Sequence, residues 1–480
     1  MSDLVLLVPE LILVGTALAL ILVARRVTRA QAVAPWVVIA AMAAITAGWA
    51  IPPDIDTTGF GGTVTSDGYA RFFDTLFAAT LALTALLSVK RLEGEHIPPA
   101  EYYALLLMAT AGMMLAASAA DLLILYLGLE LMILCAYVLV GITRDKPVAN
   151  EAAIKYFLLG SFASALLLYG IALVYGVTGA TTFGTIASVV AEHDLARHPL
   201  LLAGLALLAG GLAFKIAAAP FHAWAPDVYQ GASTPVAAFL AAGSKAASLA
   251  ALVRVCLAAF APEQRVWAEI LVGLSVLSLV LGSLLAIPQT NVKRMLAYSS
   301  IAHVGYALLG LISGTPEGAS ATVSYAFIYS FMTLGAFGVV IGLGERGEDL
   351  AAYRGLAARA PGTSALMFLF LLSLTGIPPT AGFAAKFAVI LTAVQAGHVV
   401  LAVLAVLCSV VSAFFYLRVA VLMYMTEPQE AGPPRLPAAV SAALTVAAIV
   451  IIVGGIFPDL FTLGGTKVPP YEILVRTPHP

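Results

Sequence analysis

The sequence predicts an all-α, polytopic membrane protein with about fourteen transmembrane helices. Of its 480 residues, 61% are hydrophobic and only 10% are charged, whereas soluble domains carry about 25% charged residues. Charges this sparse cannot cover a hydrated globular surface, so lipid must replace water around most of the chain. The net charge of −2 therefore does not indicate a nucleic-acid partner, because the bilayer segregates the charged residues.

The predicted helices are apolar segments long enough for a bilayer, which requires roughly 20 residues. Two places depart from a simple apolar run: 70–89 contains Arg71 and Asp74, and a short break between 119 and 121 separates two spans. The predicted spans are 4–24, 34–51, 70–89, 102–119, 121–143, 152–178, 199–219, 234–259, 266–287, 295–313, 319–343, 363–395 (interrupted), 399–425 and 437–457.

The first 24 residues are interpreted as a retained helix and not as a cleaved leader. They include Asp3 and Glu10, lack a basic start, and are followed by Arg25, Arg26 and Arg29. A positive flank behind an apolar stretch is typical of a membrane span whose following loop is cytoplasmic.

Lysine and arginine in the connecting loops predict that both termini face outward. With the N-terminus outside, thirteen cationic residues fall on the cytoplasmic side, five on the opposite side and six within spans. The cytoplasmic set is Arg25, Arg26, Arg29, Lys90, Arg91, Arg144, Lys146, Lys293, Arg294, Arg346, Arg354, Arg359 and Arg435, and the outer set is Arg71, Arg197, Arg265, Lys467 and Arg476.

No cofactor or metal site is expected in this chain. Cys135, Cys256 and Cys408 lie far apart in apolar runs, and no CxxC or Cys/His spacing is present. Zinc, haem and iron–sulfur sites are therefore not expected. The chain also lacks a dinucleotide-binding glycine fingerprint after a strand, so neither nicotinamide nor flavin is expected.

Two predicted spans are interrupted by proline. Residues 214–236 read FKIAAAPFHAWAPDVYQGASTPV, with Pro220 at the break, and 376–387 read GIPPTAGFAAKF, with Pro378 and Pro379 in mid-span. A broken helix frees backbone amides and carbonyls that hydrocarbon cannot satisfy, so it persists only where protein or a hydrated cavity supplies partners. Water beside these breaks is the simplest expectation.

The broken helices are spans seven and twelve, five apart, and spans six and eleven share a mixture of aromatic, serine and glycine residues over 156–170 and 325–338. Repeats of five helices must be inverted relative to each other, a construction typical of transporters. The expected organisation within one membrane domain (1–480) is a three-helix segment (1–95), two inverted five-helix repeats (102–260 and 266–425) and a final helix (437–457).

Four ionisable residues stand near the middle of predicted spans: Glu130, Lys215, Lys245 and Lys386. A lysine at the bilayer centre costs about 2.5–3.5 kcal/mol even on insertion scales. A structural ion pair between Glu130 and Lys215 is one interpretation, but it leaves Lys245 and Lys386 unexplained. The alternative is a proton relay, because desolvation favours the neutral amine of lysine whereas arginine keeps its proton. Movement of the Glu130 carboxylate towards or away from Lys215 could then make Lys215 take up or release a proton.

Other polar residues in or near the spans also carry predictions. His303, in YSSIAHVGYALLG, is a possible relay residue, and His222 is a weaker one, since a histidine on a polar helix face is more often a packing residue. Arg254 and Arg418 are expected to snorkel towards the interface. Lys155 and Glu151 are expected to pair, and Asp227 could cap a helix or mark a proton entrance.

The stretches quoted above, together with SKAASLAALVR and NVKRMLAYSSIAHVGY, resemble the antiporter-like membrane subunits of respiratory complex I. Within that family the pattern is similar to the N-type subunits, because no long lateral helix follows the last span and Lys386 stands where M-type subunits usually have glutamate. By this resemblance Glu130, Lys215, Lys245 and Lys386 match the family's charged positions on spans five, seven, eight and twelve.

The resemblance implies a proton-translocating subunit in a bacterial inner membrane, driven by redox chemistry elsewhere. NADH, FMN, iron–sulfur clusters and quinone would be bound by other subunits, and the partners would be neighbouring membrane subunits, lipid and protons. The first alternative is a cation/proton antiporter subunit of Mrp type. It is disfavoured because the mid-span lysines outnumber carboxylates three to one. The second alternative, a structural scaffold, leaves the buried lysines and broken helices unexplained.

Overall fold

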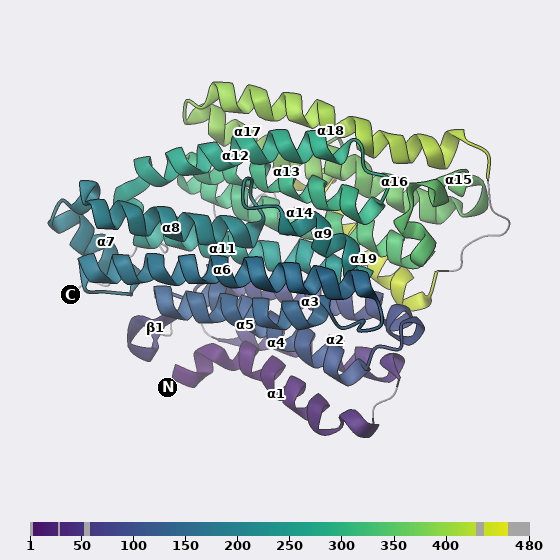
Figure 1. The fold of residues 1–480 in the computed structure, drawn as a ribbon, viewed down its shortest axis with the longest axis horizontal. Coiled ribbons are helices and arrows are strands. Elements are labelled where there is room, and N and C mark those ends of the chain that lie inside the picture. The colour runs from purple at the N-terminus through teal and green to yellow at the C-terminus, as the bar shows by residue number, and fades with distance from the viewer. Residues whose placement is uncertain (1–2, 27–28, 52–57, 429–435, 459–480) are drawn as a thin grey trace.

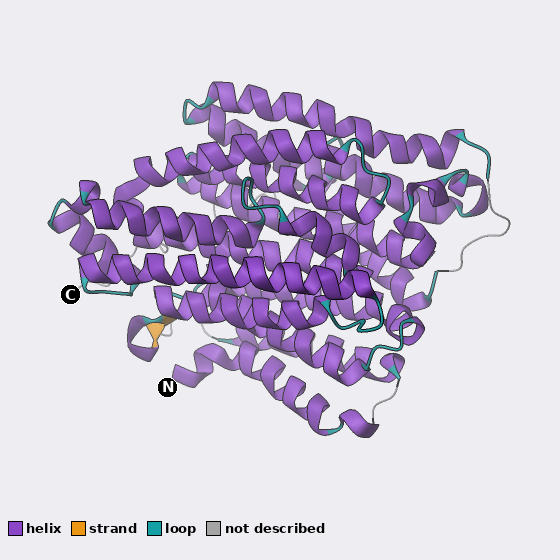
Figure 2. Ribbon diagram, viewed as in Figure 1, coloured by secondary structure: helices purple, strands orange, loops and turns teal. Residues whose placement is uncertain are grey.

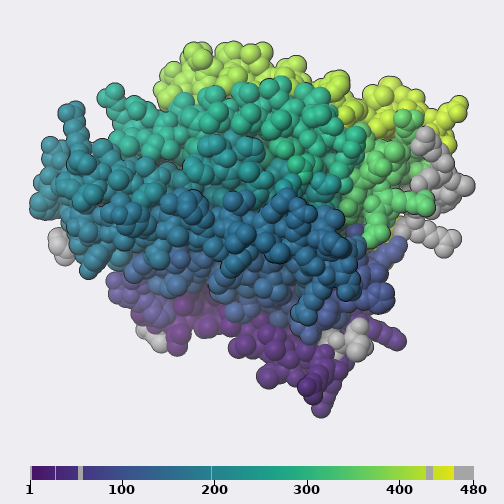
Figure 3. All heavy atoms as spheres, in the orientation of Figure 1, coloured from purple at the N-terminus to yellow at the C-terminus, as the bar shows by residue number. Residues whose placement is uncertain are grey.

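The computed structural model describes residues 3–26, 29–51, 58–428 and 436–458 and is built almost entirely of helices lying side by side (Figures 1 and 2). The N-terminal helices lie at one edge and α18 lies at the other, and the middle of the chain fills the face seen in Figure 3. The first helices are α1 (Val8–Leu22), α2 (Ala30–Ala50), α3 (Gly68–Gly94), α4 (Pro99–Ser118), α5 (Leu122–Val140), α6 (Pro147–Thr178), α7 (Phe183–Glu192), α8 (Pro199–Ile216), α9 (Trp224–Gly231), α10 (Thr234–Phe239) and α11 (Lys245–Arg254).

The remaining helices are α12 (Gln264–Ala286), α13 (Val292–Ile312), α14 (Pro316–Leu343), α15 (Leu356–Arg359), α16 (Pro361–Thr375), α17 (Ala381–Gln395), α18 (Val399–Met425) and α19 (Ala438–Ile456). Two π-helical turns, Leu240–Ser244 and Val255–Ala259, flank α11. Strands β1 (Thr58–Gly59) and β2 (Val64–Thr65) form a small antiparallel ribbon. Short 3₁₀ turns occupy Asp3–Leu7, Ala24–Arg26, Phe60–Gly62, Leu195–Arg197, Ala261–Glu263, Glu345–Glu348 and Leu350–Tyr353.

The prediction of an all-α membrane fold is confirmed. Among the described residues, thirteen helices are long and apolar enough to cross a membrane, and the shorter apolar helices α16 and α17 make up the remaining, interrupted span. Large apolar side chains on α6, such as Phe157 and Phe162, are 49% and 66% exposed. Such side chains suit a surface that faces lipid or a membrane partner.

The helix containing Arg71 and Asp74 and the two helices on either side of the short break all form. Arg71 and Asp74 lie in α3 and are buried by neighbouring helices. The break between α4 and α5 is stabilised by Asp121, whose carboxylate accepts hydrogen bonds from the amides of Leu123 and Ile124. A side chain that caps free amides in this way starts a helix, which explains how the chain reverses within so few residues.

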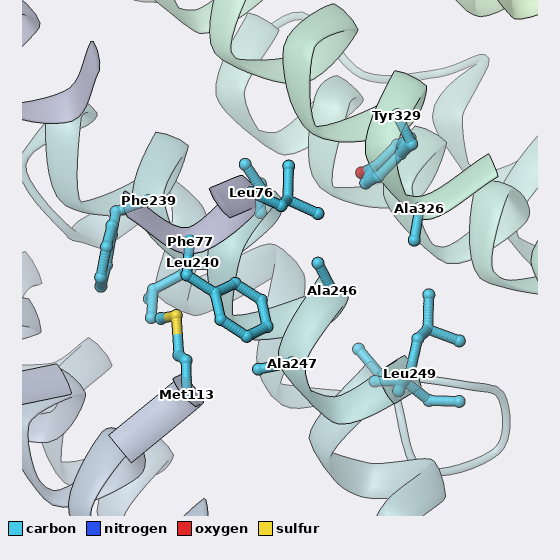
Figure 4. Packing of buried hydrophobic residues seen from close by; sticks show 14 of the residues in the cluster. Leu76, Phe77, Met113, Phe239, Leu240, Ala246, Ala247, Leu249, Ala326 and Tyr329 are labelled. Atoms are coloured by element: carbon cyan, nitrogen blue, oxygen red, sulfur yellow. The ribbon is translucent and has the colours of Figure 1, made fainter. Parts of the chain in front are cut away.

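The centre of the bundle is the segment from α10 to the second π turn. A stretch of 18 residues within this segment is completely buried inside the protein. Figure 4 shows the packing around it: Leu76 and Phe77 of α3, Met113 of α4 and Tyr329 of α14 surround Ala246 and its neighbours. Lys245 therefore starts a helix that is shielded from lipid on every side by protein.

The first helix break is stabilised by specific partners for its freed backbone groups. At the end of α8, Ala217 adopts a left-handed conformation with φ 57°. Beyond it, the amide of Ala219 donates to Ser278 Oγ at 2.9 Å, and Trp224 Nε1 donates to the carbonyl oxygen of Phe214 at 3.0 Å. Protein groups thus supply the hydrogen bonds that a break within a membrane requires.

The expectation that Arg254 snorkels to the interface is wrong. Arg254 is buried and forms two hydrogen bonds with Asp67, from Nη1 at 2.9 Å and from Nη2 at 2.7 Å, while Nε donates to the carbonyl oxygen of Ala117. Asp67 is the N-cap of α3, so its carboxylate is already held in place. Arg418 does lie near a helix end, but it donates to the carbonyl oxygens of Ile287 and Gln289.

Replacing Arg254 with methionine is expected to destabilise the protein by about 3–5 kcal/mol, because the Asp67 carboxylate would remain buried without its partner. Thermal dissociation of the assembled protein, followed by native gel electrophoresis, measures the change. The matched control is Arg265→Met, because Arg265 and Glu269 form a pair with 92% and 73% exposed side chains, and exposed pairs contribute little. Equal stability of the two variants would contradict the prediction.

Charged residues join the loops at the end of the bundle where α3 ends and α6 begins. Lys146 Nζ lies 2.9 Å from Glu95 Oε1 and 2.8 Å from Glu345 Oε1. The hydrogen bond from Lys146 holds the pKa of Glu345 below its usual value. These contacts connect the N-terminal three helices to both the middle and the later part of the chain.

Candidate functional site

Glu130 and Lys215 form the ion pair that the sequence suggested. Lys215, in the last turn of α8, is 1% exposed at its side chain, and its Nζ lies 2.9 Å from Glu130 Oε1 of α5. Ser164 of α6 donates to the same carboxylate oxygen at 2.5 Å, and Lys215 also contacts Ser164 Oγ at 3.3 Å. Three helices therefore meet at one charged cluster, placed beside the first helix break.

Lys245 has no carboxylate partner among the described residues, and its Nζ donates to Ser300 Oγ of α13 at 2.6 Å. The residue is 1% exposed, and the ring of Tyr229 lies 5.9 Å from Nζ. It follows directly after the π turn Leu240–Ser244. Such turns inside α-helices occur frequently at functional sites.

Lys386 binds the carbonyl groups that the second break frees. Its Nζ donates to the carbonyl oxygens of Leu374 and Thr375, at 3.0 and 2.9 Å, and to Ser409 Oγ at 3.2 Å. These carbonyls terminate α16, where the helix dipole favours a cation. Lys386, from the first turns of α17, therefore connects the two halves of the broken span.

One face of α13 connects the surroundings of Lys245 to those of Lys386. Ser300, His303 and Tyr306 stand three residues apart, and this spacing places side chains on the same side of a helix. Ser300 accepts from Lys245, and Lys386 Nζ lies 4.5 Å from the centre of the Tyr306 ring.

His303 occupies the middle of this face and is 3% exposed. Its Nδ1 lies 2.6 Å from Tyr325 Oη, and its Nε2 lies 3.2 Å from Tyr416 Oη. The structure thus brings the predicted relay residue between the two lysines, held by two tyrosine hydroxyls. We call Ser300, His303 and Tyr306 the α13 polar face.

The structure does not bring Lys215 and Lys245 into direct contact. Within the described part of the chain, no hydrogen bond joins them. His222 lies in the first break, between α8 and α9. Its Nδ1 is buried without a hydrogen-bond partner among the described groups.

Lys155 and Glu151 pair as expected, with 2.7 Å between Nζ and Oε1. The structure adds Asp227, whose Oδ2 lies 2.8 Å from Lys155 Nζ and whose Oδ1 lies 2.6 Å from Arg294 Nη1. Asp227 lies in the first turn of α9, so the suggestion that it caps the following helix is wrong. Its carboxylate links α6 to α13.

Comparisons with known proteins agree with this architecture. A family model described as "NADH:quinone oxidoreductase/Mrp antiporter, TM" matches residues 119–412. The subunit N of NADH-quinone oxidoreductase from Desulfovibrio desulfuricans is 44% identical, over 96% of this chain and 95% of the relative. Subunit N 2 from Rhizobium meliloti is also 44% identical, over 95% of each chain.

The chain belongs to the antiporter-like membrane subunits of NADH-quinone oxidoreductase. The resemblance to N-type subunits is thereby confirmed. Members of this family also occur among solved structures: a chain of respiratory complex I from Thermus thermophilus is 34% identical, with a TM-score of 0.82, covering 96% of this chain and 100% of that one. A chain of the Mrp complex from Dietzia, 22% identical with a TM-score of 0.85 and covering 98% of each chain, shares the fold.

For this antiporter-like subunit, reasoning from sequence missed the hydroxyl groups that surround the charges. No role in the site was predicted for five hydroxyl residues: Ser164, Ser300, Tyr306, Tyr325 and Tyr416. The spacing of serine, histidine and tyrosine in SSIAHVGY was a usable signal, because it repeats every three residues. The tyrosines of α14 and α18 left no such signal, since only packing brings them to His303.

Proposed function

We propose that this chain is a proton-translocating membrane subunit of an NADH–quinone oxidoreductase, in which Glu130, Lys215, Lys245 and Lys386 carry protons and His303 relays them. The α13 polar face supports this proposal most strongly, because it connects the hydrogen-bond partner of Lys245 to the ring beside Lys386. Removal of a proton donor from such a series would interrupt proton transfer along it.

Glu130 would act as the modulating charge. A carboxylate within hydrogen-bonding distance favours the charged form of its lysine partner, so moving Glu130 away would favour release of a proton by Lys215. The receiving groups would lie around Lys245, with water and His222 in the intervening space. Ser164, which binds both members of the pair, would follow the carboxylate as it moves.

The oxidation of NADH and the reduction of quinone would take place in other subunits, which would hold FMN and the iron–sulfur clusters. This chain would be one of several neighbouring membrane subunits that couple this redox reaction to proton movement. The names of its relatives, NADH-quinone oxidoreductase subunit N in several bacteria, support that assignment.

The bacterial inner membrane is the proposed location, with both termini on the outer side. The family supports the membrane, and the distribution of lysine and arginine in the loops, thirteen against five, supports the orientation. Arg294 and Lys146, both on the proposed cytoplasmic side, form ion pairs at the same end of the bundle as the end of α3.

We also propose that the bundle contains two inverted five-helix repeats. The packing of corresponding helix pairs is consistent with such repeats. Helix α4 packs on α5 where Gly112 faces Gly128, and α12 packs on α13 where Gly305 faces Leu279. Helices α6 and α14 each pack against a broken span, formed by α8 and α9 in one case and by α16 and α17 in the other. The same order of contacts recurs five spans later, when each broken helix is counted as one span.

The dependence of proton uptake on sodium and potassium distinguishes this proposal from the alternative, a cation/proton antiporter subunit. Vesicles containing the assembled complex are expected to take up protons on NADH addition at the same rate when sodium and potassium are replaced by an impermeant cation. A pH-sensitive dye measures the uptake. A requirement for sodium or potassium, or an exchange of either for protons without NADH, would favour the antiporter.

A further inference from the structure

Helix α1 lies at one edge of the bundle (Figure 1). A groove between α1 and α2 lies outside the proposed proton relay. Its volume is about 590 Å³, within the range of about 300–1,000 Å³ that is usual for ligand sites. Ala19 of α1, Val23 directly after it, and Ala32 and Trp36 of α2 form its walls. Each of these side chains belongs to a predicted membrane span or its immediate end, so the groove runs along the acyl-chain region.

Two arginines, Arg26 and Arg29, line one end of this groove. They stand between the end of α1 at Leu22 and the start of α2 at Ala30, which places them at the depth of lipid headgroups. Both are exposed, and neither forms an ion pair within the described residues. Trp36, 64% exposed, lies about two turns further in, and tryptophan is enriched at membrane interfaces.

A second groove shows what distinguishes this one. It lies between α16 and α19, has a volume of about 640 Å³, and is lined by residues such as Thr363, Leu369 and Ile452, none of them charged. The two grooves are similar in size and in the apolar character of their walls. The α1–α2 groove differs in having a pair of cationic side chains at one end.

We propose that the α1–α2 groove binds an anionic phospholipid, with its phosphate at Arg26 and Arg29 and an acyl chain along the apolar walls. Basic pockets between transmembrane helices favour anionic headgroups, and arginine binds phosphate oxygens through paired donors. The occupant is a lipid and not a protein helix because the apolar walls continue directly from a charge pair at headgroup depth. Binding at this site would anchor the N-terminal helices, which enclose α3 and α4 on the outer edge.

The test uses the assembled complex in vesicles that contain phosphatidylglycerol or phosphatidylcholine carrying a photoactivatable acyl chain. Labelled peptides are identified by mass spectrometry. Phosphatidylglycerol is expected to label α1 and α2 at the groove several-fold more than phosphatidylcholine. The double variant Arg26→Gln/Arg29→Gln is expected to reduce this labelling about 25-fold, since each arginine near an anionic lipid contributes about a fivefold change in affinity.

Matched variants distinguish lipid binding in the groove from a general attraction of anionic lipid to cationic side chains. Arg25→Gln removes an equal charge beside the groove without lining it, and it is expected to retain most labelling. Ala19→Phe fills the apolar part and is expected to abolish labelling, whereas Leu18→Phe, on the neighbouring exposed position, is not. Equal labelling by both lipids, an equal loss in Arg25→Gln, or cross-linking of the groove to a neighbouring protein would each overturn the proposal.

Discussion

Replacing Lys245 with alanine is expected to lower NADH-driven proton uptake by about tenfold or more, in membranes that contain the assembled complex. Lys245 supplies the amine that donates to Ser300 at the start of the α13 polar face, and alanine cannot hold a proton. Loss of a positioned proton donor typically lowers the rate of a reaction by about 10²–10⁴-fold. Proton uptake and NADH oxidation are measured on the same membranes, so that coupling and turnover are compared directly.

Two further variants identify the cause of the loss. Lys245→Arg keeps the positive charge but does not release its proton, so it is also expected to fail if proton transfer is the role of this residue. Ser248→Ala is the control, because Ser248 is buried on the same helix and its hydroxyl donates to the carbonyl oxygen of Ser244, within that helix turn and away from Ser300. Full pumping by correctly assembled Lys245→Ala complexes would favour the scaffold interpretation.

Replacing Glu130 with glutamine is expected to slow turnover about tenfold. Glutamine preserves the shape of the side chain and a partner for Ser164, but it removes the negative charge that holds the Lys215 ammonium at 2.9 Å. A hydrogen bond to a charged group contributes about 1.5–3 kcal/mol, and about 1.4 kcal/mol corresponds to a tenfold change. Steady-state NADH oxidation and proton uptake, each recorded across a range of pH, measure the effect.

The matched control is Glu151→Gln, which removes a carboxylate that also pairs with a lysine. Glu151 is 64% exposed at its side chain, and Lys155 retains Asp227 as a partner, so this variant is expected to pump normally. If Glu130→Gln leaves the rate and its pH profile unaltered, the idea that this carboxylate modulates Lys215 is wrong.

The sequence alone determined the membrane fold and the positions of its spans. Even the stretch containing Arg71 and Asp74 proved to be helix α3, because the requirement for about 20 apolar residues is a local property of the chain. Proline marked both breaks, because its loss of a backbone hydrogen-bond donor is also a local property that does not depend on the rest of the fold. The cost of a buried charge likewise singled out Glu130 and the three lysines.

Only the tertiary structure decided which groups surround those charges. Arg254 was expected to reach the interface, yet Asp67, 187 residues away in sequence, pairs with it inside the bundle. Tyr325 and Tyr416 meet His303 because α14 and α18 pack beside α13. The energy of a membrane span is set residue by residue along one helix, whereas a hydrogen-bond partner depends on which helices pack together, and nothing in a local sequence pattern specifies that choice.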